Sequence, residues 1–263
     1  MNAVTTGRTA DANYIDLTAA SNGSDLSPGE VRGILAYADD ELMSSHTLMH
    51  LCDLAGPAME PLIAMLSYAQ DDTGHALLWY HAASRKLGRS PDQLVFERDP
   101  VEFLCSPLTQ FESSDWPVVV AKNYLYKSAD VVRQEALAES CELEAVRSMV
   151  SYTLDEDRFH EMFWSSWVTQ LLEWGGDSAN RLLAAVRSRL VDVPSVFDLG
   201  ELLPPDAATP LLATWANRVS GVLQVSVDVD AVSGSSRGPS DSGPDGLIAN
   251  MQSVHRSFPG ATW

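Results

Sequence analysis

The sequence predicts an all-α protein in which four long helices form one bundle. Residues typical of helix starts precede each long segment with helical apolar spacing. Glycine or proline follows these segments, where helices end. Alternation of apolar and polar residues, which is typical of a strand, is confined to residues 222–232, beside a loop. A β-rich core is therefore not expected.

The first helix is predicted over residues 27–54. Ser27 and Glu30 have the spacing of a capping box, in which each side chain accepts a hydrogen bond from the backbone of the other residue. Pro28 occupies the first helical position, where a missing N–H costs nothing. Gly56, which precedes a proline, is the expected break.

The second helix is predicted to begin near Pro57 or Pro61, because proline is tolerated only in a first turn. It should continue to Leu87 and stop at Gly88, a residue suited to the left-handed conformation that ends many helices. Its roughly 30 residues would span about 45 Å at about 1.5 Å per residue. A helix of this length is typical of a bundle.

The connection to the third helix contains two further start signals. Ser90 and Asp99 each precede a proline, and we expect short helical turns after them. Asp115 is the expected cap of a third helix over residues 115–140. The fourth helix follows and should end at Gly175.

The remaining helices are shorter. Asp177 is the expected cap of a fifth helix, which Pro194 should terminate. Thr209, which precedes a proline, begins a sixth helix, and a last short helix should cover residues 247–257.

Four long helices with one longer connection between the second and third are typical of a ferritin-like bundle. We therefore expect a ferritin-like four-helix bundle with additional C-terminal helices, in one domain of residues 27–263. Residues 1–26 have no apolar period and are predicted to form a disordered tail. Residues 228–246, rich in Gly, Ser, Pro and Asp, are predicted to form a loop.

The composition excludes several classes of protein. Acidic residues outnumber basic ones 36 to 17, a formal charge of −19, which argues against binding to nucleic acid or to an anionic membrane surface. No charge-free stretch exceeds residues 73–84, so no transmembrane helix is expected, and no signal peptide is predicted either. Three scattered cysteines form neither a disulfide framework nor a zinc motif. A cytoplasmic location is the expectation.

Two carboxylate-x-x-histidine pairs lie on two of the predicted long helices. Asp72 and His75 share one face of the second helix, and Asp157 and His160 share one face of the fourth. One carboxylate from each of the other two helices would complete the ligand set of a carboxylate-bridged site for two iron ions. The six candidate metal ligands are Glu41, Asp72, His75, Asp130, Asp157 and His160.

Spacing predicts that these residues converge. Asp130 precedes Asp157 by 27 residues across one helix–helix turn, and Glu41 precedes Asp72 by 31, so antiparallel helices bring them to a similar depth. Glu135 is a rival for the place on the third helix. Anionic oxygen ligands would neutralise the charge of two iron ions, and each imidazole would add one nitrogen.

The same residues also have a structural interpretation. Asp157 could lie in solvent beside Arg158, and His160 could hydrogen-bond Glu156, four residues earlier. Both pairs have Asp where the usual pattern has the longer Glu, so a bridging geometry built for Glu would not transfer unchanged. His46 and His50, four residues apart on the first helix, are further ligand candidates or partly buried polar residues near the bundle end.

Apolar neighbours place both motifs near the core. On the fourth helix the predicted face consists of Met149, Thr153, Asp157, His160, Trp164 and Leu171. On the second helix the predicted stripe consists of Leu62, Leu66, Ala69, Thr73, Ala76 and Tyr80, with Asp72 and His75 at its flank. Buried ionised carboxylates are costly unless a cation pairs with them. A bound metal would be one such cation.

Several segments resemble the phenylacetic acid catabolic protein family, which contains the ferritin-like subunits of ring-1,2-phenylacetyl-CoA epoxidase. Residues 69–76 (AQDDTGHA) resemble the family's A-Q-D-E-x-G-H-A signature, and residues 157–160 (DRFH) its second E-x-x-H motif. Further likeness lies in Phe96-Glu97-Arg98, in Asp115-Trp116, and in the ending from Met251-Gln252 to Pro259-Gly260 and Trp263, which resembles the non-catalytic C subunit.

The resemblance implies a subunit of a multicomponent monooxygenase. In that family a catalytic subunit holds the di-iron centre and inserts oxygen into an aromatic CoA thioester, the related C subunit supports it, and a reductase supplies electrons. The chain keeps both histidines, unlike a C subunit, and has Asp in place of Glu, unlike a catalytic subunit.

Three hypotheses follow. The favoured one is a supporting subunit paired with a homologous ferritin-like catalytic subunit, or a homo-oligomer. The second is a self-sufficient di-iron oxygenase acting on another aromatic or carrier-bound substrate, and the third is a bundle without a redox role. A stable complex should bury well over about 2,000 Å². Of the tryptophans on the fourth helix, Trp174 is expected to reach an interface, whereas Trp164 and Trp167 belong mostly to the core.

Overall fold

The computed structural model describes residues 26–52, 58–110, 113–204, 206–228, 234, 236–238, 246–259 and 261. The tail expected over residues 1–26 and the loop expected over residues 228–246 lie largely outside these residues. Within the described part, the chain contains helices and no β-strand, as the sequence predicts for an all-α protein. No described helix combines the length and the apolar character needed to cross a bilayer.

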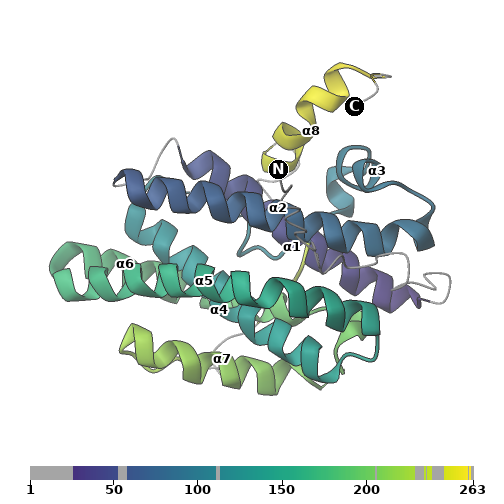
Figure 1. Cartoon of the computed structure of the whole chain (residues 1–263). Coiled ribbons are helices and arrows are strands. Elements are labelled where there is room, and N and C mark those ends of the chain that lie inside the picture. Colours follow the sequence, from purple (N-terminus) through teal and green to yellow (C-terminus); the bar gives the residue numbers. More distant parts are fainter. Residues whose placement is uncertain are drawn as a thin grey trace, which may run out of the picture.

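Four long helices make up the body of the molecule. They are α1 (Pro28–Leu51), α2 (Met59–Leu87), α4 (Trp116–Ser140) and α5 (Glu144–Trp174). Helix α1 packs along α2, α4 packs along α5, and α2 also contacts α5 (Figure 1). This arrangement confirms the predicted ferritin-like bundle.

The shorter elements cover the sides of the bundle. They are α3 (Pro91–Phe96), η1 (Pro100–Glu102), α6 (Gly176–Arg189), η2 (Leu190–Phe197), η3 (Gly200–Leu202), α7 (Ala208–Leu223) and α8 (Leu247–Ser257). Helices α6 and α7 pack against α4 and α5, and α8 contacts α1 and α3 and projects from the bundle (Figure 1). The last helix has the predicted bounds.

Local capping chemistry explains the starts of α1, α3 and η1, whereas Asp115, the expected cap of α4, makes no side-chain capping hydrogen bond. The side chain of Ser27 accepts a hydrogen bond from the backbone of Glu30, and the Glu30 carboxylate accepts one from the backbone of Ser27, so the predicted capping box is present. The same pattern starts α3 at Ser90 and η1 at Asp99. Gly88 ends α2 in the left-handed conformation, as predicted.

Other boundaries differ from the sequence prediction. Helix α1 ends at Leu51, three residues before the expected end, and Gly56 lies outside the described residues. Asp177 does not cap α6, because the helix already begins at Gly176. Pro194 does not directly follow that helix either; it lies inside the 3-10 segment η2, whose looser hydrogen bonding tolerates proline.

The buried face of α2 is centred on Asp72, which corrects the predicted stripe. Leu66 and Thr73 are exposed, although both were expected on the buried side. Met65 and Trp79 are buried in their place. The apolar pattern alone misplaced the face because the polar side chains of this helix point inward. The predicted face of α5 is confirmed, since all its members are buried.

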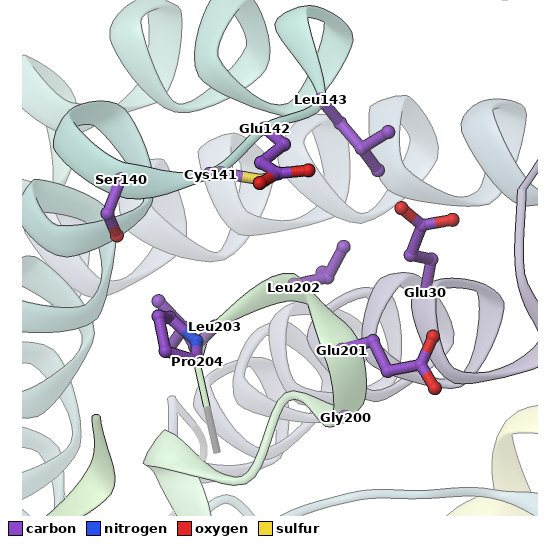
Figure 2. A pocket seen from close by; sticks show the side chains of 10 residues that line it. All are labelled: Glu30, Ser140, Cys141, Glu142, Leu143, Gly200, Glu201, Leu202, Leu203 and Pro204. Atoms are coloured by element: carbon purple, nitrogen blue, oxygen red, sulfur yellow. The ribbon is translucent and has the colours of Figure 1, made fainter. Parts of the chain in front are cut away.

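A cleft of about 390 Å³ opens at the end of the bundle where α1 begins, beside the turn between α4 and α5 and the segment η3. Figure 2 shows that three carboxylate side chains line this cleft: Glu30 of α1, Glu142 of the turn and Glu201 of η3. Its lining includes none of the six predicted metal ligands. The six predicted metal ligands therefore lie in the bundle interior, away from this cleft.

Candidate functional site

The six predicted ligand residues lie together inside the bundle. Glu41 comes from α1, Asp130 from α4, and the two carboxylate-x-x-histidine pairs from α2 and α5. All six side chains are buried. Each of the four carboxyl groups lies within 4 Å of the same ammonium group, which belongs to Lys127 of α4.

Lys127 occupies the middle of this carboxylate cluster. Its Nζ lies 2.7 Å from Asp157 Oδ1 and 2.8 Å from Asp72 Oδ1, both hydrogen-bond distances. It lies 3.4 Å from Glu41 Oε2 and 3.6 Å from Asp130 Oδ2. The sequence analysis did not identify this residue, although it stands on the same helix face as Asp130, three positions earlier.

Every oxygen of the four carboxyl groups accepts a hydrogen bond from the protein. Besides Lys127, the donors are Tyr37, Ser44, Tyr126, Arg133 and Gln134. The shortest of these bonds, each 2.7 Å, run from Tyr126 Oη to Glu41 Oε1, from Arg133 Nε to Asp130 Oδ1 and from Gln134 Nε2 to Asp157 Oδ2. Buried carboxylates need such partners, because desolvation of an unpaired charge is costly.

The two histidines point one ring nitrogen inward and the other toward the surface. His75 Nε2 lies 2.9 Å from the carboxylate of Glu156, and His160 Nε2 lies 3.2 Å from that of Asp71. The predicted alternative, a bond between His160 and Glu156, is therefore wrong, because Glu156 contacts the histidine of the other motif. These crossed pairs join α2 to α5.

The inward nitrogens have no hydrogen-bond partner. The Nδ1 atoms of His75 and His160 are buried and unpaired, and both face the carboxylate cluster. His75 Nδ1 lies 3.5 Å from Asp157 and 3.7 Å from Glu41. His160 Nδ1 lies 3.3 Å from Asp157 and 3.5 Å from Asp72. A ring nitrogen aimed at carboxylates, with a carboxylate behind the other nitrogen, is the usual arrangement of a metal-ligating histidine.

Burial and the Lys127 ammonium set the protonation of the cluster. Burial raises the pKa of Glu41 to about 7, although the positive charge of Lys127 acts in the opposite direction. Burial also acts to raise the pKa values of Asp72 and Asp157, but the ammonium and His160 outweigh it and hold both pKa values below the usual range. The surrounding carboxylates keep the pKa of Lys127 well above its ordinary value, despite its burial.

The carboxylates act on the histidines in the same way. Burial alone would lower the pKa of His75, but its contacts with Glu41 and Asp157 raise it to about 10. Burial likewise opposes the charged form of His160, but Asp157, Asp71 and Asp72 raise its pKa well above the ordinary value. Four carboxyl groups thus face four cationic groups: two imidazoles, Lys127 and Arg133.

A second layer of buried ion pairs surrounds the cluster. Asp40 contacts Arg133 at 2.6 Å and Arg237 at 2.9 Å. Asp39, its neighbour on α1, pairs with Arg98. The guanidinium of Arg237 comes from the segment before α8, so this layer links that segment to the bundle core.

The donor set fits a metal ion only in part. Glu41, Asp72, His75 and Asp157 offer ligand atoms within 4.8 Å of one another and could hold one metal ion. The unpaired nitrogens of the histidines favour a metal. The Lys127 ammonium acts against it, because it already contacts Asp72 and Asp157, two of the carboxylates that would hold the metal.

The other candidates lie outside the cluster. Glu135 faces outward and pairs with Arg158 and Arg218, so Asp130 and not its rival provides the carboxylate of α4. His46 and His50 lie with ring centroids 4.4 Å apart near the end of α1. Burial and the neighbouring imidazole lower the pKa of His46 to about 4.

Comparison with known proteins agrees with the motifs and the fold. No curated protein matches the chain. The family model described as phenylacetic acid catabolic protein matches residues 20–263, which includes all four long helices and the whole carboxylate cluster. The chain therefore belongs to the phenylacetic acid catabolic protein family.

Proposed function

We propose that this chain is the supporting subunit of a multicomponent monooxygenase of the phenylacetyl-CoA epoxidase type. In this proposal a homologous ferritin-like subunit carries the di-iron centre and inserts oxygen into an aromatic CoA thioester, with electrons from a reductase. The present chain pairs with that subunit and stabilises it. Family membership supports the assignment to this class of complex.

The position of Lys127 is the observation that favours a supporting role. Its ammonium lies 2.7 Å from Asp157 and 2.8 Å from Asp72, two of the carboxylates that would hold a metal. An internal cation at this point removes the electrostatic need for a metal, since the carboxylates are already paired. The remaining oxygens accept hydrogen bonds from Ser44, Tyr126, Arg133 and other side chains, so the cluster is complete without another ligand.

The second candidate is a self-sufficient di-iron oxygenase, and the histidines favour it. Two buried Nδ1 atoms make no hydrogen bond and face the carboxylates, so the rings in their neutral state would offer these atoms to a metal. If iron bound, Glu41, Asp72, Asp130, Asp157 and both histidines would hold it, and it would supply dioxygen chemistry. Glu156 and Asp71 would then orient the imidazole rings through their Nε2 atoms.

Co-purification separates these functions. The full chain is expressed together with a ferritin-like chain of the same family that has Glu in both carboxylate-x-x-His motifs. A supporting subunit should elute with this probe as one complex, and the iron should belong to the probe. A chain that elutes alone as a monomer, and itself contains iron, would contradict the supporting role and favour the second candidate.

A further inference from the structure

The outward face of α5 carries a row of exposed aromatic and apolar side chains. Tyr152, Phe159, Met162 and Trp174 have exposed fractions of 51, 65, 64 and 64%. Phe163, in the same row, is partly exposed. At about 100° per residue, the four aromatic residues fall within an arc of roughly 60°. The row runs from Tyr152 to Trp174, about 33 Å at about 1.5 Å per residue.

The charged side chains in and beside this arc are acidic. Glu156 lies within it, Asp155 and Glu173 lie about 40° outside it, and all three are exposed. Arg158, the nearest base on α5, bridges Asp155 at 3.1 Å and Glu135 of α4 at 3.2 Å, so Asp155 is neutralised and Glu156 and Glu173 form the negative rim. The face therefore combines aromatic anchors with a negative rim, and the whole chain carries a formal charge of −19.

The row lies directly over the buried cluster. Phe163 contacts Tyr68 of α2 with ring centroids 5.3 Å apart, and Tyr68 packs on the ring of His160 at 4.1 Å. Glu156, 47% exposed, and Asp71, 35% exposed, hold the outer nitrogens of the two histidines. A molecule bound on this face would touch the groups that fix the site histidines.

We propose that this face of α5 is the docking surface for the ferritin-like partner subunit, whose contact surface is apolar at its centre and rich in Lys and Arg at its edge. This inference rests on the proposed function. Exposed Trp and Tyr are the residue types that dominate binding energy at interfaces. A second copy of this chain is not the occupant, because it would bring the same acidic residues against this acidic rim, and like charges across an interface are unfavourable.

The competing surface lies on α2. Met59, Ile63, Leu66 and Leu77 form an exposed apolar row there as well. This row points in another direction. Asp71, which faces α5, lies at least about 80° around the helix from each of these four positions, at about 100° per residue. The row lacks aromatic residues. Ile63 therefore provides a matched test of position, and Val254, exposed on α8, provides a distant control.

The test measures binding of the full chain to the co-expressed family member with Glu in both motifs, by titration calorimetry of the separated chains. Phe159→Gln and Trp174→Gln should each weaken binding at least tenfold, whereas Ile63→Gln and Val254→Gln should stay within twofold. Glutamine keeps helix propensity and removes the exposed apolar surface. Glu173→Lys should weaken binding and reduce its salt dependence, since it places a base against a basic rim.

The outcomes are distinguishable. If the wild-type chain binds and the Phe159 and Trp174 variants bind equally well, the docking surface is not on α5. A larger loss of affinity with Ile63→Gln would have the same meaning. Both outcomes would leave the proposed function standing. Sedimentation showing a homodimer that Trp174→Gln dissociates would overturn the choice of partner. A wild-type chain that binds no such family member would overturn both this inference and the proposed function. Circular dichroism of each variant verifies that the helices remain intact.

Discussion

The ammonium of Lys127 makes a cluster of buried carboxyl groups tolerable inside the bundle. It contacts Asp72 and Asp157 at hydrogen-bond distance and lies near Glu41 and Asp130. Four carboxyl groups in one interior would otherwise repel each other and resist ionisation. At the residue scale, the lysine is therefore a structural cation, and its removal should reveal how much stability depends on it.

We predict that Lys127→Met lowers the free energy of unfolding by about 3–5 kcal/mol, because it leaves buried carboxylates without their cation. Chemical denaturation in the presence of a chelator measures this value without compensation by metal. The double variant Lys127→Met/Asp157→Asn removes one charge of each sign. Its loss of unfolding free energy should be smaller than the summed losses of the two single variants, by roughly 0.5–3 kcal/mol. A loss below about 1 kcal/mol for Lys127→Met would contradict the structural role.

His46 provides a test of pH dependence away from the cluster. Burial and the charge of His50 lower its pKa in the folded state from 6.5 to about 4. The unfolded chain therefore binds the proton more readily, and stability falls as the pH drops from about 6.5 to about 4. His46→Gln should reduce this loss, measured as the change in thermal midpoint between pH 7 and pH 4.5. An identical pH profile in the variant would show that folding does not lower the pKa of His46.

At the scale of elements, Gly33 is one of the glycines that allow η3 to approach α1 closely. A Cβ atom on Gly33 would lie 2.1 Å from the backbone oxygen of Leu199, far inside contact distance. A Cβ on Gly74, in α2, would meet no atom within 4 Å. Both glycines lie inside helices, so the intrinsic preference for alanine is the same at both positions.

These environments predict opposite effects of the same substitution. Gly74→Ala should stabilise the protein by about 0.5–1 kcal/mol through helix propensity. Gly33→Ala should destabilise it by about 1–3 kcal/mol, because η3 must shift away from α1. Urea denaturation of both variants measures the difference. Equal effects at the two positions would contradict the close packing of η3 on α1.

The sequence predicted most helices because their start and stop signals are local. The capping box at Ser27 and the glycine at position 88 act through neighbouring residues, and the structure confirms both. The buried face of α2 was misplaced because Asp72 is itself part of the core, which an apolar pattern does not indicate. Lys127 was missed because its partners come from three other helices, and only tertiary packing brings them together.

At the scale of the whole molecule, charge is distributed unevenly between interior and surface. The described buried acids at the bundle centre are matched by lysine, arginine and histidine, as in the contacts of Asp40 with Arg133 and Arg237. The excess of acidic over basic residues in the described part of the chain therefore lies mainly on the surface. Such a surface disfavours self-association and favours a basic partner, which agrees with the proposed pairing with a different subunit.

The metal content of the wild-type chain decides whether Lys127 or a metal is the cation of the carboxylate cluster. The full chain is purified without its partner from iron-replete cells, and iron per chain is measured by mass spectrometry. If Lys127 is the resident cation of the cluster, the iron content should lie well below one ion per chain. Close to two iron ions per chain, lost in His75→Ala and His160→Ala variants that keep their helicity, would contradict the supporting role.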